Sequence, residues 1–206
     1  MAKKSIGAYI TLDGEKEFRT ATSACNKSVA ALKSEMKLAE AQTVGNANTL
    51  DTLKKKHDIL SRTLDEHVKK EETVKKGLKN SEEQYEKVGN KLAEYKSKLQ
   101  QTKSALEELE NSSETTEEAL QEQRELVEGL EKIVSKGEET YRRAGNRVSD
   151  WKKQLNNAEA QTIRATKALN ENDTYLKEAE KSWKGCAKSI DEFGNETDDT
   201  VNQITN

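Results

Sequence analysis

Hydrophobic residues recur along this chain with a period of seven. If Phe18 takes position d of a heptad abcdefg, the same register continues without interruption to Phe193. Of the 51 a and d positions in that span, 37 are hydrophobic, against 29 of the other 155 residues. A sustained period of 3.5 residues is typical of helices that wind around partner helices. The pattern therefore predicts an all-α protein with long coiled-coil helices over residues 15–193.

Both ends of the chain follow other patterns. Residues 5–12 alternate between apolar and small or polar side chains, and Asp13-Gly14 follows as a turn signal. Alternation with a period of two is typical of a β-strand, so we expect one short strand within residues 1–14, which would need a partner to be stable. Residues 194–206 are expected to form an acidic, polar C-terminal tail.

Six polar clusters along the heptads could each end a helix. As breaks, they predict about five helices of roughly 20–35 residues, which could fold as antiparallel helical hairpins. None of the clusters contains proline, so a continuous helix could also bridge each of them. The clusters are Gly45–Asn48, Asn80-Ser81, Asn111–Ser113, Ser135–Gly137, Asn170–Asp173 and Gly194-Asn195.

The chain contains an internal repeat. Residues 82–92 match residues 138–148, and the offset of 56 residues equals eight heptads. Repeats at such spacing indicate stacked or concatenated helical units, and 56 residues is the size of one helical hairpin. The matched pairs include Tyr85 and Tyr141, and Gly89 and Gly145, and the match runs on through Tyr95 and Trp151, Lys96 and Lys152, and Leu99 and Leu155.

The composition fits extended helices better than an ordinary core. Of the 206 residues, 35% are charged, 32% are hydrophobic and none is proline, whereas globular domains carry roughly 45–50% apolar residues. The net charge of −3 hides an asymmetry, because residues 1–103 sum to +6 and residues 104–206 to −9. Ten glutamates and one cation, Arg124, lie between Glu107 and Glu131. We expect this acidic block to lie against the basic segment before it, in the same chain or in a partner.

The candidate metal ligands are few. His57 and His67 both occupy the heptad seam, and His67 precedes Glu71 by four residues, on the same helical face. That spacing could supply half a metal site, but no third ligand or Cys/His cluster accompanies it. We therefore interpret both histidines as polar seam residues that fix the helix register. Cys25 and Cys186 are too far apart in sequence to suggest a metal site, and we expect two free thiols in a reducing compartment.

The aromatic and basic residues suggest structure rather than chemistry. Trp151, Trp183 and the tyrosines at 85, 95 and 141 all occupy a or d positions, so we expect core anchors rather than base-stacking residues. The lysine runs 54–56 and 75–76 lie among acids, as on a solvated helix face. The sequence has no glycine-rich phosphate loop and no serine elbow. We expect no enzyme activity and no catalytic, cofactor or metal site.

Targeting and membrane signals are also missing. No apolar run is long enough for a signal peptide or a membrane span. We therefore expect a soluble protein made inside the cell, with no nucleic acid or membrane bound by this region.

The order of several motifs resembles a known family. Residues 6–18, continuing through residues 26–36, resemble the start of tail tape measure proteins of bacteriophages and prophages of Gram-positive bacteria. Residues 151–159 are similar to that family's Trp-Lys-x-x-Leu-x-x-Ala repeats, and residues 189–196 to the segment that closes its N-terminal coiled region. Family members usually run to many hundreds of residues, with a hydrophobic middle that this chain lacks. The resemblance therefore implies the N-terminal part of such a protein or a truncated product, and the family's pore-forming and wall-cleaving activities are not carried over.

The resemblance implies a structural role in the virion. Copies would lie along the inside of a growing tail while tail-tube subunits polymerise around them, and helix length would set tail length. The implied partners are tail-tube and tail assembly chaperone proteins. Separately from the resemblance, the heptad seam itself predicts self-association. The implied location is the host cytoplasm during assembly and the tail lumen afterwards. Two alternatives stay open: a cytoskeletal or surface coiled-coil spacer, and a nucleic-acid or membrane scaffold that uses the basic first half.

Overall fold

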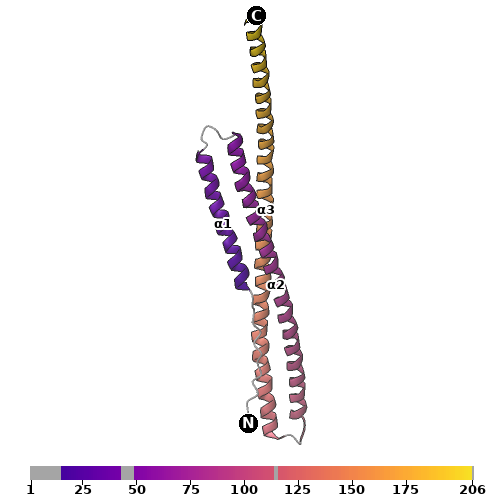
Figure 1. Cartoon of the computed structure of the whole chain (residues 1–206). Helices are drawn as coiled ribbons and strands as arrows, with labels where there is room; N and C mark the ends of the chain where they lie inside the picture. The colour runs from indigo at the N-terminus through magenta and orange to yellow at the C-terminus, as the bar shows by residue number, and fades with distance from the viewer. Residues whose placement is uncertain (1–14, 43–48, 114–115, 206) are drawn as a thin grey trace. The chain divides into compact units, whose positions relative to one another are not determined.

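The computed structural model describes residues 15–42, 49–113 and 116–205, with side chains described as far as Phe193. Every element in this part is a helix: α1 spans Glu15–Gln42, α2 spans Leu50–Glu110 and α3 spans Glu117–Thr205 (Figure 1). Successive helices pack antiparallel, which confirms the all-α prediction with hairpins. The strand expected within residues 1–14 lies outside the described residues.

Of the six predicted cap clusters, Asn111–Ser113 follows the end of α2, and Gly45–Asn48 lies outside the described residues. Between α1 and α2, Thr49 caps the start of α2, because its hydroxyl accepts a hydrogen bond from the Thr52 amide at 3.4 Å. Between α2 and α3, the Asn111 side chain donates to the Glu107 carbonyl at 2.8 Å. Thr116 accepts from the Ala119 amide at 3.3 Å. These contacts satisfy backbone groups that a helix end leaves open.

Continuous helix bridges the other four clusters, so the interpretation as about five short helices is wrong for the described residues. Near Gly137, Glu139 accepts hydrogen bonds from Arg142 and Arg143 one turn later, and these arginines lower the pKa of Glu139 to about 2. Such pairs support a helix locally. In the cluster at 170–173, Asn172 donates to the Leu53 carbonyl of α2 at 3.1 Å. Residues that resemble caps are used here for contacts within or between helices.

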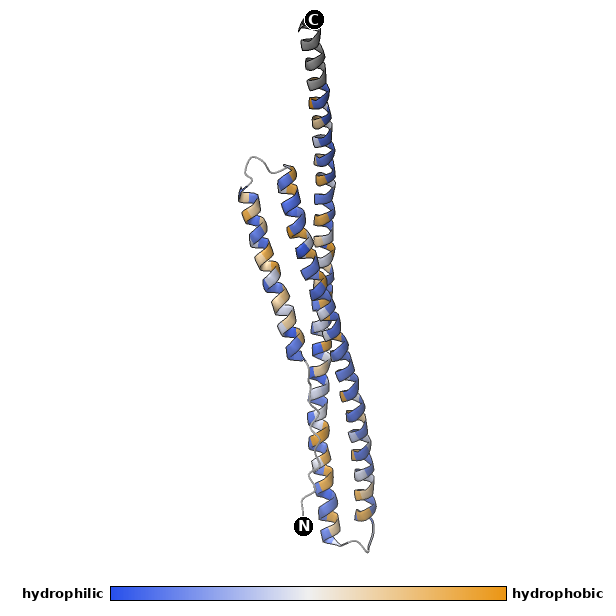
Figure 2. Cartoon of the chain, in the orientation of Figure 1, coloured by the Kyte–Doolittle hydropathy of each residue, from blue (hydrophilic) through white to orange (hydrophobic). Residues whose placement is uncertain are grey.

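The described chain divides into two compact units. The first unit, here called the aromatic unit, holds residues up to Ala21 and Glu72–Asn157. The second, here called the histidine unit because both histidines of the chain lie in it, holds Thr22–Glu71 and residues from Ala158 onward. Figure 2 shows that hydrophilic residues cover most of each helix, with apolar residues at intervals.

The core of the aromatic unit is built around Trp151. Its side chain is 1% exposed and packs edge-on against Phe18, with ring centroids 6.4 Å apart. The ring also lies against Gly77, where a Cβ atom would be only 2.8 Å from the indole. A glycine on α2 therefore makes the space that the largest core side chain fills. Val74, Val88 and Ala144 complete the fully buried part of this core.

The 56-residue repeat packs against itself in this unit. Tyr85 and Tyr141 stack, with ring centroids 4.4 Å apart and an interplanar angle of 18°. A Cβ atom on Gly89 would lie 3.1 Å from Tyr141, and one on Gly145 would lie 3.3 Å from Tyr85. Each tyrosine thus covers the glycine of the other repeat copy.

Charged pairs between the two repeat copies are reciprocal in the same way as the tyrosine–glycine contacts. Lys96 pairs with Glu138 at 2.6 Å, and the residues 56 positions away, Lys152 and Glu82, pair at 3.5 Å. The two copies therefore form a pseudo-two-fold antiparallel interface, as an isologous contact does between identical subunits.

The core of the histidine unit is more polar. Its buried apolar residues include Val29 on α1, Leu53 and Ile59 on α2, and Ala165 on α3. Four polar residues are buried with them: Thr22, Thr52, His67 and Asn172. On the surface, Arg62 of α2 pairs with Glu35 of α1 at 2.9 Å.

Candidate interaction site

His57 joins α2 to α3 in the histidine unit. Its Nδ1 lies 2.6 Å from an Asp173 carboxylate oxygen, and both side chains are partly exposed. The neighbouring Asn172 side chain is buried and bonds the backbone of Leu53. These two contacts fix how α2 and α3 align, which is the role expected for polar seam residues. The sequence indicated Asp173 only as part of a cap cluster, because its position is adjacent to the seam rather than on it.

His67 is buried in the same unit. Its Nδ1 has no hydrogen-bond partner among the described residues. Burial lowers the pKa of His67, and the charges of Lys70 and Lys33 lower it further. No group of three or more His, Cys, Asp or Glu side chains in the described part of the chain is placed to hold a metal ion. The structure thus does not bring His57, His67 and Glu71 together as ligands.

Both cysteines are free thiols. Cys25 is half-buried, and burial raises the pKa of its thiol, with a smaller contribution from Glu66. Cys186 is exposed on α3.

The basic and acidic residues pair largely as the charge pattern predicts. Within the lysine run 54–56, Lys55 pairs with Asp51 at 2.8 Å and Lys56 with Glu40 at 3.8 Å. Across the α2–α3 turn, Lys103 pairs with Glu131 at 2.6 Å. The acidic block therefore contacts the basic segment that precedes it in the same chain.

The expected core role is wrong for one aromatic residue. Trp151 is buried and the Tyr85–Tyr141 stack lies within the aromatic unit, whereas Trp183 is 69% exposed. The reason is the length of α3, which continues past the point where α2 begins at Leu50. Figure 1 shows α3 extending well past the start of α2.

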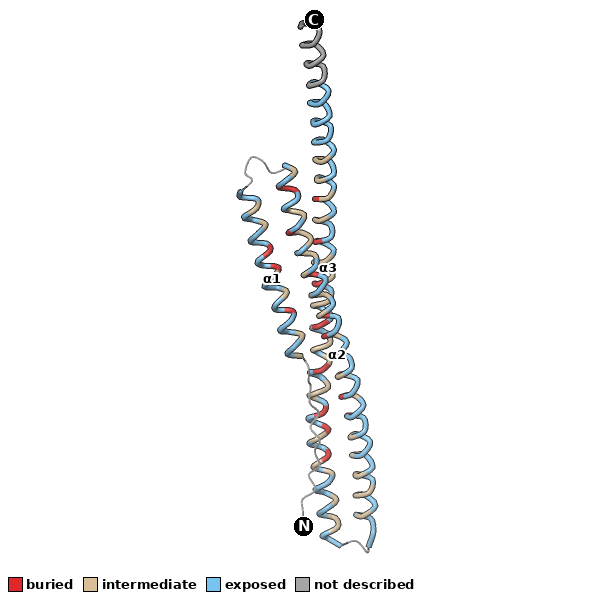
Figure 3. The backbone as a smooth tube through the Cα atoms, viewed as in Figure 1, coloured by how far each residue is buried: buried red, intermediate tan, exposed pale blue. Residues whose placement is uncertain are grey.

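Four residues form an apolar stripe on this part of α3. Residues 181–193 are all exposed (Figure 3). Trp183, Ile190 and Phe193 are 69%, 70% and 68% exposed, and Cys186 lies between them in the heptad. We call these four residues the end stripe. Exposed apolar patches of this kind mark interaction surfaces more often than isolated exposed residues do.

A groove continues the end stripe towards the start of α2. Its volume is about 790 Å³, and Leu50, Leu53, Tyr175 and Ala179 line it together with Trp183 and Cys186. Asp51, Lys54 and Glu178 add charge to the lining. A side chain or helix from outside would find an apolar groove edged by charged groups, which is the typical make-up of an interaction site.

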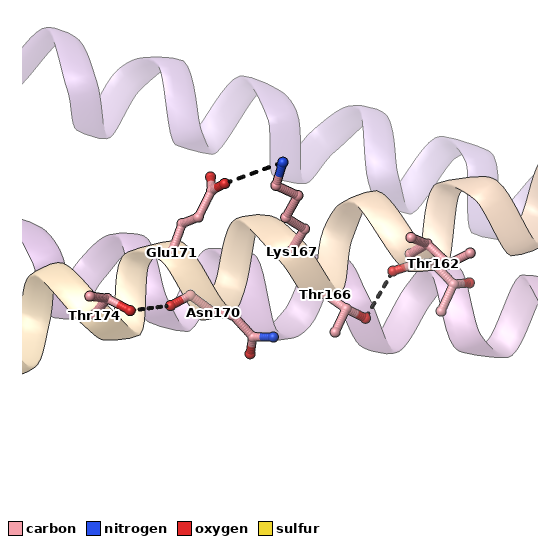
Figure 4. Close-up of a pocket in the computed structure, with 7 residues that line it drawn as sticks. Thr162, Thr166, Lys167, Asn170, Glu171 and Thr174 are labelled. Atoms are coloured by element: carbon pink, nitrogen blue, oxygen red, sulfur yellow. Dashed lines mark hydrogen bonds and ion pairs between the residues drawn. The ribbon is translucent and has the colours of Figure 1, made fainter.

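A second hollow lies on α3 alone (Figure 4). The Thr166 hydroxyl donates to the Thr162 carbonyl at 2.9 Å, and the Thr174 hydroxyl donates to the Asn170 carbonyl at 3.1 Å. Lys167 pairs with Glu171 at 3.7 Å. Because these groups already have partners on their own helix, this hollow is a poorer candidate than the groove at the end stripe.

Comparisons of the chain with protein-family models, curated proteins and solved structures found no match. The resemblance to tape measure proteins therefore stays a prediction. In the described part, none of the helices combines the length and apolarity needed to cross a membrane.

Proposed function

We propose that this chain is a structural component of a phage tail and acts as a helical ruler and scaffold for tail-tube assembly. The observation that supports this function most is the continuity of its helices. α2 runs for 61 residues and α3 for 89, without proline and through four clusters that resemble helix ends. A ruler needs such continuity, because each helical residue adds a fixed rise of about 1.5 Å.

The repeat allows the length of the helix to change in whole units. A 56-residue unit corresponds to eight heptads and adds about 84 Å to a continuous helix. Adding or removing one unit leaves the hydrophobic seam in register, so length can change without disturbing the contacts on either side. The α2–α3 hairpin would be the form of the isolated chain, and it would open when tail-tube subunits surround it.

The experiment is a change of length in the phage that encodes the chain. Deleting residues 90–145 removes 56 residues and keeps the heptad register, and it should shorten the tail by about 84 Å. Duplicating the same residues should lengthen the tail by the same amount. Electron micrographs of purified virions give the tail lengths.

The control is a variant of unchanged length, Ile163→Asp, which alters an exposed side chain on α3. Its tails should match those of the parent phage. Unchanged tails in both the deletion and the duplication would overturn the proposal.

The alternative is a permanent spacer in the cytoskeleton or at the cell surface. The closed aromatic unit favours it, because the reciprocal Tyr–Gly contacts stabilise a hairpin that would not need to open. Gene order separates the two functions: tail-tube and tail-chaperone genes directly upstream are expected only for a tape measure.

A further inference from the structure

The aromatic unit brings two tyrosine rings together. Tyr85 on α2 and Tyr141 on α3 stack with ring centroids 4.4 Å apart and an interplanar angle of 18°. Both side chains are half-buried, so a small molecule in solution can reach the edges of the rings. Such a pair stabilises the packing of the helices, and two phenol rings at this distance can also react with each other.

The fold leaves the two rings little room to separate. Tyr85 covers Gly145, where a Cβ atom would lie 3.3 Å from the ring. Tyr141 covers Gly89 in the same way, at 3.1 Å. A hydrogen bond with the Tyr141 hydroxyl raises the pKa of Tyr85, and burial raises it further. This hydrogen bond indicates that the two hydroxyl groups lie close to each other, so the ring carbons ortho to them are close as well.

We propose that Tyr85 and Tyr141 form a site of oxidative cross-linking, at which a one-electron oxidant couples the two rings into dityrosine and joins α2 to α3 covalently. The site needs no further side chain, because the fold supplies the proximity of the two rings. Groups that are held in reacting geometry behave as if their concentration were very high. The coupling should therefore be selective for this pair and independent of protein concentration.

The coupling balances as a two-electron oxidation. Each phenol gives one electron to the oxidant and one proton to water, which leaves two phenoxyl radicals. A carbon–carbon bond then forms between one ring carbon ortho to each oxygen. The hydrogen atoms on these two carbons move to the phenol oxygens as the rings regain aromaticity. Two electrons and two protons leave in total, and the product keeps both hydroxyl groups.

The other described tyrosines have different surroundings. Tyr95 lies on the same helix as Tyr85, and its ring centroid is 5.6 Å from the Lys98 ammonium. Tyr175 belongs to the histidine unit and is 60% exposed. Among the described residues, Tyr85 and Tyr141 are the only stacked tyrosines. Because coupling needs two tyrosine rings in contact, Tyr95 and Tyr175 are poorer sites.

A cross-link at this site would fix the hairpin. It would close a loop of 56 residues between Tyr85 and Tyr141, and closing a loop lowers the conformational entropy of the unfolded chain. The cross-linked chain should therefore melt at a higher temperature than the parent, and α2 could no longer separate from α3 at the stack. The cross-link does not depend on a role in phage tails, because it needs only the closed hairpin.

The test oxidises the full chain at low concentration with a photo-activated ruthenium trisbipyridyl complex and persulfate. Chains of monomer size are then isolated, digested and analysed by mass spectrometry. We expect dityrosine fluorescence in these chains and a linked pair of peptides that contain Tyr85 and Tyr141. The linked pair should be lighter than the sum of its two peptides by two hydrogen atoms.

Two variants and a denaturant serve as controls. Tyr141→Phe removes one phenol of the stack and should abolish this product. Tyr95→Phe is the matched control, because it removes a phenol of the same unit outside the stack, and it should leave the yield unchanged. In urea the parent should lose the preference for this pair, since unfolding separates the rings. Circular dichroism verifies that both variants keep their helix content.

A folded parent chain that gives no linked peptides with Tyr85 and Tyr141 would overturn the proposal. A product that forms in urea with undiminished yield would overturn it as well, because the stack would then not be what brings the rings together.

Discussion

The aromatic unit and the histidine unit fill the same heptad register with different chemistry. In the aromatic unit, Trp151 and two stacked tyrosines pack onto glycines, and the two repeat copies exchange equivalent contacts. In the histidine unit, aliphatic residues share the interior with His67 and Asn172. A single hydrophobic period thus builds a tightly packed interface in one unit and a polar, position-specific one in the other.

This difference predicts unequal stability. Burying a large aromatic side chain removes more apolar surface from water than burying an alanine or a threonine. Buried polar seam residues specify alignment and lower stability relative to apolar ones. We therefore expect the histidine unit to open at lower free energy than the aromatic unit, as locally less stable regions of proteins do.

The largest expected effect comes from removing the central tryptophan of the aromatic unit. Trp151→Ala should lower the free energy of unfolding by about 3–5 kcal/mol, because it leaves a cavity next to Gly77 and Phe18. The matched variant is Trp183→Ala on the same helix, where the side chain is 69% exposed. Measured on dilute monomer, it should change stability by less than about 0.5 kcal/mol. Denaturant titrations followed by circular dichroism compare the two, and equal effects would mean that Trp151 is not the anchor of its unit.

Glycine substitutions test the packing more finely. Gly77→Ala places a Cβ atom 2.8 Å from the Trp151 ring. Overpacking of this kind costs about 1–3 kcal/mol, which should exceed the roughly 1 kcal/mol that alanine gains over glycine in a helix. A Cβ atom at Gly129 would meet no atom within 4 Å. Gly129→Ala should therefore show only the gain in helix stability. Thermal melting should therefore move in opposite directions, and a higher melting temperature for Gly77→Ala would contradict the close contact.

Acid should weaken the histidine unit. Because burial and two lysines lower the pKa of His67 below its usual 6.5, the unfolded chain binds more protons than the folded unit just below that pH. The contribution of neutral His67 is complete above pH 6.5 and is lost as the pH falls towards the lowered pKa. Denaturant titrations over this range should show a smaller pH dependence for His67→Leu than for the parent. An NMR titration midpoint of His67 at or above 6.5 would contradict the burial effect.

The smallest effects are expected from surface ion pairs, and they should be alike in both units. Lys96→Met removes an exposed pair of the aromatic unit, and Arg62→Met removes one of the histidine unit. Each should change stability by less than about 1 kcal/mol, since exposed pairs gain little in water. A much larger loss of stability in either unit would mean that ion pairs, rather than core packing, cause the difference in stability between the two units.

The seam, the repeat and the pairing of acidic with basic segments could all be predicted from the sequence. They are local or periodic properties, and one period of seven fixes which residues share a face. The pairing of Tyr85 with Gly145 and Tyr141 with Gly89 could not, because it depends on which part of the chain folds back onto which. The 56-residue offset of the repeat was the available signal for this pairing. If the two copies pack antiparallel, a contact from the first copy to the second is matched by the equivalent contact from the second to the first.

Local sequence patterns could not predict that helices continue through most of the cap clusters or that Trp183 is exposed, because both depend on how the helices pack. Asn172 carries a side chain that favours helix ends, but its bond to the Leu53 carbonyl exists only after α2 and α3 pack. Trp183 has the same heptad position as buried seam residues. Its exposure follows from α2 beginning at Leu50, which the periodicity of α3 cannot reveal.

The packing of one seam within the chain up to Ala179 is tested most directly by hydrogen exchange along α3. We expect residues 141–158, which include the buried Trp151 and Ala158, to be protected, and the exposed residues 181–193 to exchange fast. Exchange of residues 141–158 as fast as that of residues 181–193 would contradict the packed seam within the chain.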